Sequence, residues 1–390
     1  MQHKRLRVAV LIRQFSFQAG GAERYAAALV RELAPRHDIH VFAQELRAEV
    51  PGVTLHAVPL LCRRPRWLNQ LYYSAWTWWH TRRGFDVVHS HDNVAHGDIQ
   101  TVHVYPLRHL WFRQAHHLAA VLRQWMRLAI SPRLLTDWWL EHARFRDQPG
   151  RRAVAVSEPV RQALADLPGK HCPVVVIPPG IDRIDPVEPS RREADRQAAR
   201  TALGVSPDMA ERALLLWVGN DGPKKGLPGL IEALARLPAS VGLMLAGTSR
   251  PKALWQRQAA ALGVLDRIAD IGVRDDIALA YRACDVLVHP TLEDTYGMVV
   301  HEAMAHGRAV VVSAAQYCGI ASDLTHGVNA QLLQDPTDVD ALQHAIETAL
   351  QPAVQEALSN QALAWAQQHR WPMVAQALEQ LYFESLHERT

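Results

Sequence analysis

The chain has 390 residues, of which 48% are hydrophobic and 21% are charged. This length is too great for one ordinary domain, so we expect two α/β domains of about 200 residues or somewhat fewer each. The formal net charge of +3 points to no class of partner. The four cysteines are scattered without a CxxC pair, which argues against a structural zinc site and against a disulfide framework.

No sequence feature predicts insertion into a membrane or export across it. We find no run of about 18 uncharged apolar residues, the length that a spanning helix needs. The apolar stretch at 8–12 is too short for the core of a signal peptide and is followed at once by Arg13. We therefore expect the protein to stay in the cytoplasm.

Apolar strands alternate with amphipathic helices in the first half of the chain. Residues 7–12 have the composition of a buried parallel strand. Residues 22–34 follow as a helix, because Tyr25, Leu29 and Leu33 recur on one face. Further strands are expected at 40–43, 54–58, 86–90, 152–156 and 174–177. Such alternation is typical of a doubly wound parallel sheet.

A second series of the same kind follows a Pro-Pro-Gly turn that ends at Gly180. A polar, charge-dense segment at 189–202 comes next, so we place a boundary here and expect domains at 1–180 and 181–370. Residues 371–390 predict an amphipathic closing helix that packs back on the first domain. The second domain's strands are expected at 214–218, 242–246, 268–271, 286–289 and 309–313, with a helix at 227–237. The sequence therefore predicts an α/β chain of two Rossmann-like domains that face a cleft.

Two acids and a glycine stand where a strand gives way to a helix that begins at about residue 298. Glu293 and Asp294 lie in the loop, and Gly297 lets a ligand approach the backbone closely. The helix start offers amides and a positive dipole end that suit a phosphate. Glu302, near the end of the first turn, can accept hydrogen bonds from a ribose diol. The alternative interpretation is ordinary helix capping.

Two adjacent lysines follow an earlier strand of the same domain. The strand ends near Gly219, and the glycine-rich loop after it carries Lys224 and Lys225. Such a pair can neutralise a diphosphate, whereas the alternative is a solvated basic turn.

The first domain offers two weaker signals. Gly20 and Gly21 precede a helix without forming GxGxxG, so they suit either a phosphate or a tight turn. A His-Ser-His sequence ends another strand, and we favour His91 over His89 as a ligand-facing residue, against the alternative of ordinary loop histidines. No zinc-type spacing surrounds them, so we predict no metal site.

The Asp-Val-Asp sequence at 338–340 is a further candidate for metal binding, because it is a DxD string. It precedes a helical run, and we interpret it as an N-cap instead.

Together these motifs resemble those of retaining family 4 glycosyltransferases, which have the GT-B fold. The spacing of Asp294 and Glu302 matches the paired acids of that family, although the first acid there is normally glutamate. The resemblance implies that Glu302 binds the ribose and that Asp294, or Glu293 beside it, contacts the donor sugar. The amides of Gly297, Met298 and Val299 would meet the sugar and the diphosphate.

The resemblance also assigns the other motifs. Lys225, with Lys224 where arginine is commoner, stands in the phosphate clamp that begins at Gly219. The loop at Gly20 and Gly21 would close over the donor phosphates beside the acceptor, and His91 would face the donor sugar. The N-terminal domain would lie on the acceptor side and the C-terminal domain would bind the nucleotide sugar.

Within the family, Gly-Asn-Asp-Gly-Pro-Lys-Lys-Gly at 219–226 and Tyr-Cys-Gly-Ile at 317–320 are most similar to lipopolysaccharide-core α-1,3-glucosyltransferases. This implies a retaining, metal-independent hexosyltransferase that uses a nucleotide sugar, UDP-glucose first, and needs no cofactor. The alternatives are a non-catalytic scaffold with a degraded donor site, a nucleotide-sugar epimerase and a nicotinamide oxidoreductase.

Arginine and tryptophan are concentrated in two segments, 63–84 and 105–152, which hold eight of the twelve tryptophans. This combination favours a boundary between lipid and water, so we expect peripheral contact with the cytoplasmic face of the inner membrane and a glycan or lipid-linked acceptor. The alternative is a tryptophan-rich core with arginines reaching outward. No nucleic-acid motif is present, and we expect no such partner.

Overall fold

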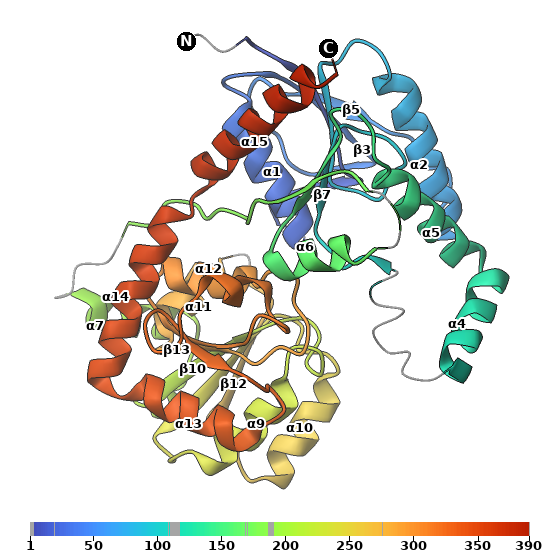
Figure 1. Ribbon diagram of the computed structural model, residues 1–390. Helices are drawn as coiled ribbons and strands as arrows, with labels where there is room; N and C mark the ends of the chain where they lie inside the picture. The colour runs from blue at the N-terminus through green and yellow to red at the C-terminus, as the bar shows by residue number, and fades with distance from the viewer. Residues whose placement is uncertain are drawn as a thin grey trace. The chain divides into compact units, whose positions relative to one another are not determined.

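The chain divides into two compact units in the computed structural model (Figure 1). Unit 1 comprises Met1–Gly180 and Trp371–Thr390, and unit 2 comprises Ile181–Arg370. The described residues are 4–18, 20–107, 109, 118–167, 169, 171–185, 191–274 and 276–389.

Unit 1 is built on a parallel sheet of seven strands in the order β5-β3-β1-β6-β7-β8-β9. The strand order reverses at β1, which pairs with β3 on one side and β6 on the other. All side chains of β1 after its first residue are buried, as expected for a strand covered on both faces. The strands are β1 (Arg7–Leu11), β3 (Asp38–Ala43), β5 (Thr54–Ala57), β6 (Val87–Ser90), β7 (Ile99–Val102), β8 (Arg152–Ala155) and β9 (Val174–Val176).

The helices of unit 1 include one that comes from the far end of the sequence. The closing helix α15 (Trp371–His387) packs on α1 and buries Leu378 and Tyr382, which confirms the predicted packing on the first domain. The other helices are α1 (Gly21–Leu33), α2 (Arg66–Thr81), α4 (Leu118–Ile130), α5 (Pro132–Arg144) and α6 (Glu158–Ala165), and β2 (Gln14–Phe15) pairs with β4 (Glu45–Leu46) outside the main sheet.

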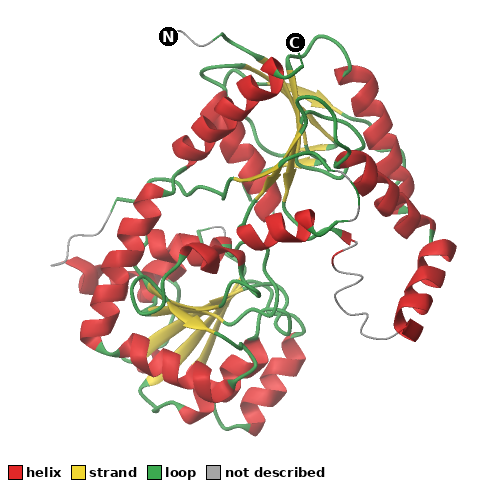
Figure 2. Ribbon diagram, viewed as in Figure 1, coloured by secondary structure: helices red, strands yellow, loops and turns green. Residues whose placement is uncertain are grey.

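Unit 2 is a second parallel sheet, with six strands in the order β12-β11-β10-β13-β14-β15. Figure 2 shows the strands of each unit as a central layer with helices on both sides. The strands are β10 (Ala213–Val218), β11 (Val241–Ala246), β12 (Ile268–Gly272), β13 (Val286–His289), β14 (Ala309–Ser313) and β15 (Gln331–Leu333). The helices are α7 (Arg192–Ala202), α8 (Pro207–Ala210), α9 (Leu227–Arg236), α10 (Lys252–Ala261), α11 (Ala278–Ala283), α12 (Met298–Ala305), α13 (Val339–Leu350) and α14 (Pro352–Gln368). The prediction of two Rossmann-like domains is confirmed.

Several local features sharpen or correct the sequence analysis. Asp338 caps α13 by accepting a hydrogen bond from the Ala341 amide at 2.9 Å, as predicted. The polar segment at 189–202 is more than a linker, because α7 occupies most of it. Strand β7 was not expected from the sequence, because its central residues Gln100 and Thr101 are polar, yet both are fully buried. Among the described residues, no helix is long and apolar enough to span a membrane.

Candidate functional site

The lysine pair and the acid pair meet at one edge of the unit 2 sheet. Strands β10 and β13 are parallel neighbours, so both end at this edge. The loop after β10 carries Lys224 and Lys225, and the loop after β13 carries Glu293 and Asp294. The carboxyl ends of such strands are where doubly wound sheets bind ligands.

Each lysine is paired with one acid. The Lys225 Nζ atom lies 2.5 Å from Asp294 Oδ2, and it also donates to the Glu293 carbonyl oxygen at 3.3 Å. The Lys224 Nζ atom lies 2.8 Å from Glu293 Oε1, with half of its side chain exposed. A ligand phosphate that binds here would have to share or displace these ion pairs.

Asp294 is held as a carboxylate by two donors. His289, the last residue of β13, places its Nε2 atom 3.1 Å from Asp294 Oδ2. Burial alone would raise the pKa of Asp294, but the hydrogen bond from His289 and the charge of Lys225 outweigh it and hold the pKa well below its usual range. Burial lowers the pKa of His289 in turn. His289 was not among the residues expected at the site, although its position at the end of a strand could have indicated it.

Gly226 allows the lysine loop and the acid loop to make a close backbone contact. Gly226 has a φ of +71°, and a Cβ atom there would lie 1.9 Å from the Pro290 carbonyl oxygen. The Leu292 amide donates to the Lys224 carbonyl at 2.9 Å across the same contact. Any larger residue at 226 would therefore separate the lysines from the acids.

The start of α12 is fixed by the segment 317–320. Gly297 caps the helix with a φ of +100°, and a Cβ atom there would lie 2.7 Å from Cys318 Sγ. The Asp294 amide donates to the Tyr317 carbonyl at 2.7 Å, which holds the acid loop against this segment. The amides of Met298 and Val299 belong to the first turn of α12, where a helix supplies no carbonyl partner of its own.

Glu302 lies one turn further along α12 and is almost fully buried, with 6% of its surface exposed. The hydroxyl of Tyr281, on α11, donates to its Oε2 atom at 2.6 Å. Tyr281 is a residue that the sequence analysis missed, because nothing in its local pattern separates it from an ordinary core tyrosine.

The predicted residues of unit 1 form a group of their own. Gly20 caps α1, which begins at Gly21, and the Gly20 carbonyl accepts from the Arg24 amide at 3.1 Å. His91, 6% exposed, lies just beyond the end of β6, with its Nδ1 atom 3.1 Å from His103 Nε2. Burial, together with neighbouring histidines, lowers the pKa of His91 well below its usual value.

The competitor His89 is a core residue. Its Nδ1 atom lies 2.6 Å from the Tyr382 hydroxyl and its Nε2 atom 2.7 Å from Thr101 Oγ1, so buried neighbours use both ring nitrogens. Burial lowers its pKa to about 3. This geometry leaves His91 as the better candidate of the two.

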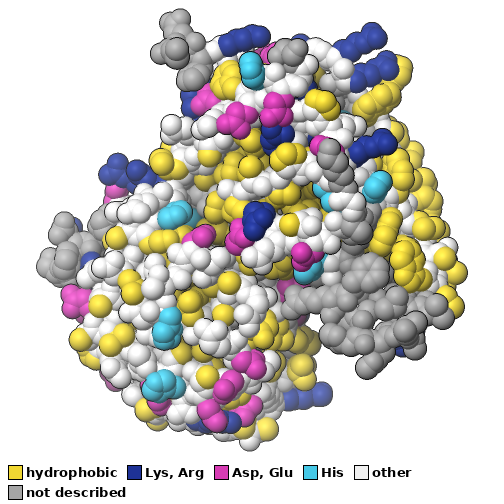
Figure 3. Space-filling view, in the orientation of Figure 1, with side chains coloured by type: hydrophobic (Ala, Val, Ile, Leu, Met, Phe, Trp, Pro, Cys, Tyr) yellow, Lys and Arg dark blue, Asp and Glu magenta, His cyan; other side chains and the backbone are white. Residues whose placement is uncertain are grey.

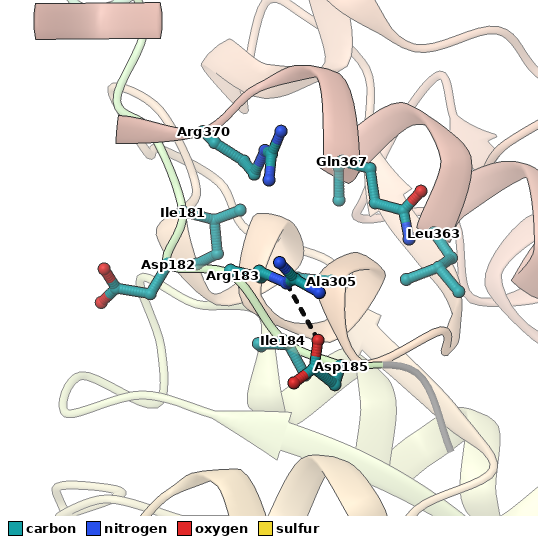
Figure 4. Close-up of a pocket in the computed structure, with 10 residues that line it drawn as sticks. Ile181, Asp182, Arg183, Ile184, Asp185, Ala305, Leu363, Gln367 and Arg370 are labelled. Carbon is teal, nitrogen blue, oxygen red and sulfur yellow. Dashed lines mark hydrogen bonds and ion pairs between the residues drawn. The ribbon is translucent and has the colours of Figure 1, made fainter. Parts of the chain in front are cut away.

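Other possible sites are less informative. The pocket in Figure 4 is lined by Ile181, Arg183, Asp185 and residues of α14, and none of the predicted site residues lines it. Arg183 and Asp185 pair with each other there at 2.9 Å. Within the described ranges, no group of three or more histidine, cysteine and acidic side chains could hold a metal ion.

Of the described tryptophans in the two tryptophan-rich segments, four are exposed and three are half-buried, and one of these three, Trp76, packs against a core cluster. Seven of their eight tryptophans are described, and none of the seven is buried, while Trp111 lies outside the described residues with the rest of 110–117. On α2, Trp78 and Trp79 are 48% and 59% exposed, and the Arg82 guanidinium lies 3.6 Å from the centre of the Trp79 ring. Figure 3 shows hydrophobic side chains gathered over the edge of unit 1 where Figure 1 places α2 and α5. Among the described side chains of α4 and α5, the exposed large apolar residues are Trp125, Met126, Ile130, Leu135 and Trp139.

Two family models match the chain, one in each half. The family described as Glycosyltransferase Family 4 matches residues 19–183, and the one described as Glycosyl transferases group 1 matches residues 212–352. Lipopolysaccharide glucosyltransferase WaaG of Escherichia coli (strain K12) is 28% identical over 204 residues, 50% of this chain and 50% of WaaG. A D-inositol 3-phosphate glycosyltransferase of Geodermatophilus obscurus is 34% identical over 231 residues, 55% of this chain and 48% of that protein. The chain thus spans about half the length of these curated relatives.

Solved structures match over nearly the whole chain. A crystal structure of WaaG, a glycosyltransferase involved in lipopolysaccharide biosynthesis, has a TM-score of 0.76 at 22% identity and covers 95% of this chain and 98% of its own. HepE of Anabaena in complex with UDP and glucose has a TM-score of 0.70 at 19% identity, with coverages of 96% and 98%. These likenesses confirm the expected GT-B class of fold.

Proposed function

The chain belongs to the family 4 glycosyltransferases, and we propose that it moves a sugar from a nucleoside-diphosphate donor to a hydroxyl group of an acceptor. The observation that carries the proposal is the meeting of Lys224 and Lys225 with Glu293 and Asp294 beside the start of α12. Cations and helix amides converge there, as a diphosphate requires. The HepE complex supports a UDP-sugar as donor, with UDP-glucose first.

Each part of the unit 2 site has a role in this reaction. Glu302 binds the ribose, and the amides of Gly297, Met298 and Val299 contact the sugar and the diphosphate. Lys225 and Lys224 stabilise the negative charge that grows on the diphosphate as it leaves. Asp294 positions the donor sugar, while the neighbouring Glu293 forms an ion pair with Lys224. Gly219 allows the clamp loop to turn at the end of β10.

Transfer proceeds with retention at the anomeric carbon and without a metal ion. The bond from the anomeric carbon to the β-phosphate oxygen breaks, and a bond to the acceptor oxygen forms on the same face. The acceptor proton passes to the leaving phosphate oxygen, so no protein base is needed. For unit 1, the family resemblance assigns Gly20 and Gly21 to the donor phosphates and His91, whose pKa burial lowers, to the donor sugar, and we propose the same roles.

A thermal-shift screen against UDP, GDP, ADP and their sugars tests the donor site, because a ligand that binds the native state raises its melting temperature. We expect stabilisation by UDP and UDP-glucose that is lost in Glu302→Ala. Stabilisation without turnover on any acceptor would favour the scaffold alternative, and no stabilisation at millimolar nucleotide would contradict the donor site itself.

Product analysis tests the finer mechanism. Activity that survives EDTA is expected, because lysines and amides balance the diphosphate charge. The anomeric configuration of the product, read by NMR, should match that of the donor. Loss of activity in EDTA that Mg²⁺ or Mn²⁺ restores would contradict metal independence, and an inverted product would contradict retention.

We also infer that unit 1 contacts the cytoplasmic face of the inner membrane through α2, α4 and α5, where the enzyme would meet a lipid-linked acceptor in lipopolysaccharide or cell-surface polysaccharide assembly. The exposed tryptophans and the Arg82 stacked on Trp79 suit the boundary between lipid tails and phosphates. Co-sedimentation with phosphatidylglycerol–phosphatidylcholine vesicles should fall at least fivefold in Trp78→Gln/Trp79→Gln. Leu254→Gln, which changes an exposed apolar residue of unit 2, is the control. Equal binding by both variants would contradict the inference.

A further inference from the structure

A pocket of about 690 Å³ opens at the edge of the unit 1 sheet. It lies where β1, β3 and β6 end, because Arg13, Gln44 and Asp92 each follow one of these strands and line it. The order of the sheet reverses at β1, and such a switch point is where doubly wound sheets bind ligands. None of the residues assigned to the donor lines this pocket.

Side chains in the pocket wall are held in fixed orientations. Gln44 and Asn69 exchange two hydrogen bonds between their amide groups, at 3.0 and 2.9 Å. Asp92 accepts from the Arg13 amide at 2.6 Å and from Arg13 Nε at 2.9 Å. Planar polar groups of this kind form paired hydrogen bonds with neighbouring sugar hydroxyls, and their fixed orientation lowers the entropy lost on binding.

The lining of the pocket carries a small excess of positive charge, because it holds four arginines and three acids, Glu23, Glu45 and Asp92. Four arginines line the pocket, and two of them are used internally, since Arg13 pairs with Asp92 and Arg47 with Glu45. Arg63 and Arg66 are exposed, and neither makes an ion pair or a side-chain hydrogen bond within the described part of the chain. Arginine matches the planar oxygens of phosphates and carboxylates.

We propose that this pocket binds an anionic acceptor, a glycan whose hydroxyl groups meet Gln44, Asn69 and Asp92 while its phosphate or carboxylate meets Arg63 and Arg66. The proposal rests on the glycosyl transfer proposed above and names the class of its acceptor. Phosphate and carboxylate share the charge and the paired oxygens that the arginines recognise, so the probes must separate them.

Calorimetric titration with glucose, glucose 6-phosphate and glucuronate tests the pocket. Saturating UDP keeps these probes out of the lysine clamp of unit 2. We expect glucose 6-phosphate or glucuronate to bind at least tenfold more tightly than glucose, and the better of the two identifies the anion. Arg63→Gln/Arg66→Gln should weaken that binding at least fivefold. Both side chains are exposed, and the melting temperature checks that the variant folds.

The matched control is Arg82→Gln/Arg83→Gln, which removes two arginines of the same basic segment that do not line the pocket. Equal affinity for glucose and for both anions would overturn the proposal, as would equal loss in the two arginine variants. Failure of the donor proposal looks different, because UDP itself would then not bind. In that case the titration is repeated in Lys225→Ala without UDP. The proposal is then tested by the affinity for the anions against that for glucose, and by the effect of the pocket variant against that of the control variant.

Discussion

The two units differ in whether the cationic side chains of their candidate sites have partners within the protein. In unit 2 the cations of the candidate site are paired inside the protein, Lys225 with Asp294 at 2.5 Å and Lys224 with Glu293 at 2.8 Å. In unit 1, Arg63 and Arg66 stand exposed at a pocket, and Trp78 and Trp79 stand exposed on a helix. The two lysines of unit 2 thus have acidic partners within the protein, whereas these side chains of unit 1 face solvent.

The units also differ in what they bury at the ends of their strands. Unit 2 holds a partly buried ion pair, in which Asp294 stays charged beside His289 and Lys225. Unit 1 buries His89 and His91 beside the half-buried His103, and desolvation lowers the pKa values of all three so that they stay neutral. Unit 2 thus places a charged pair at its candidate site, whereas unit 1 places neutral histidines next to its Arg13–Asp92 ion pair, and three measurements test this contrast.

The largest effect is expected from Lys225→Ala. The change removes the cation closest to Asp294 and to the proposed diphosphate, so kcat should fall about 10²- to 10³-fold. Lys224→Ala should cost less, because half of that side chain is exposed and solvent screens its charge. Initial rates of UDP release measure both. A kcat within threefold of the parent in Lys225→Ala would mean that the Lys225–Asp294 ion pair serves folding alone.

An intermediate effect concerns the buried histidines of unit 1. An unfolded histidine titrates near pH 6.5, whereas the pKa of His89 is about 3 in the fold. Below pH 6.5 the unfolded state therefore binds a proton that the folded state does not. For this group, the free energy of unfolding decreases by about 2 kcal/mol as the pH falls from 7.5 to 5. The lowered pKa of Asp294 has a separate window, since its contribution is present above pH 4 and is lost only in stronger acid.

Urea unfolding at pH 7.5, 6 and 5 measures this dependence. His89→Gln keeps polar atoms near Tyr382 and Thr101 but cannot titrate, so its stability should change less between the three pH values than that of the parent. If the free energies of unfolding of the parent and the variant changed equally with pH, His89 would not be the source of the loss of stability in acid.

The smallest effect is expected from Tyr281→Phe. The ring and its stacking on His306 remain, while the hydrogen bond to Glu302 is lost at a cost of about 1 kcal/mol. The KM for the donor should rise about three- to tenfold with kcat nearly unchanged, because Glu302 loses its orientation at the ribose. A 2′-deoxy donor provides the control, since the increase in KM caused by removing the 2′-hydroxyl should be smaller in this variant than in the parent. An equal penalty in parent and variant would remove Tyr281 from ribose positioning.

Much of this architecture could be predicted from local pattern. The strands of both sheets follow short apolar runs, and the lysine and acid motifs stand at strand ends that a parallel sheet must bring to one edge. The helix start at Gly297 and the cap at Asp338 are equally local, because one residue type and one turn determine each.

What could not be predicted depends on contacts between distant residues. The choice between His89 and His91 rests on Tyr382, which lies 293 positions from His89. The polar strand β7 is stable because Arg144 donates to the Gln100 side chain and to the Thr101 carbonyl, at 3.0 and 2.6 Å. The exposure of the tryptophans is a property of the packed surface, and composition alone could not separate a surface from a core.

The return of the chain to unit 1 at Trp371 also determines the order in which the two units can be completed during synthesis. Ribosomes add roughly 5–20 residues per second, so Tyr382 is made about 15–60 s after the histidine that it contacts. Throughout that interval the nascent unit 1 lacks α15, and the face of α1 that this helix covers has no cover from its own chain. Unit 2 is continuous in sequence and needs no such late segment. Unit 1, whose synthesis begins first, is therefore completed only after unit 2 has been synthesised.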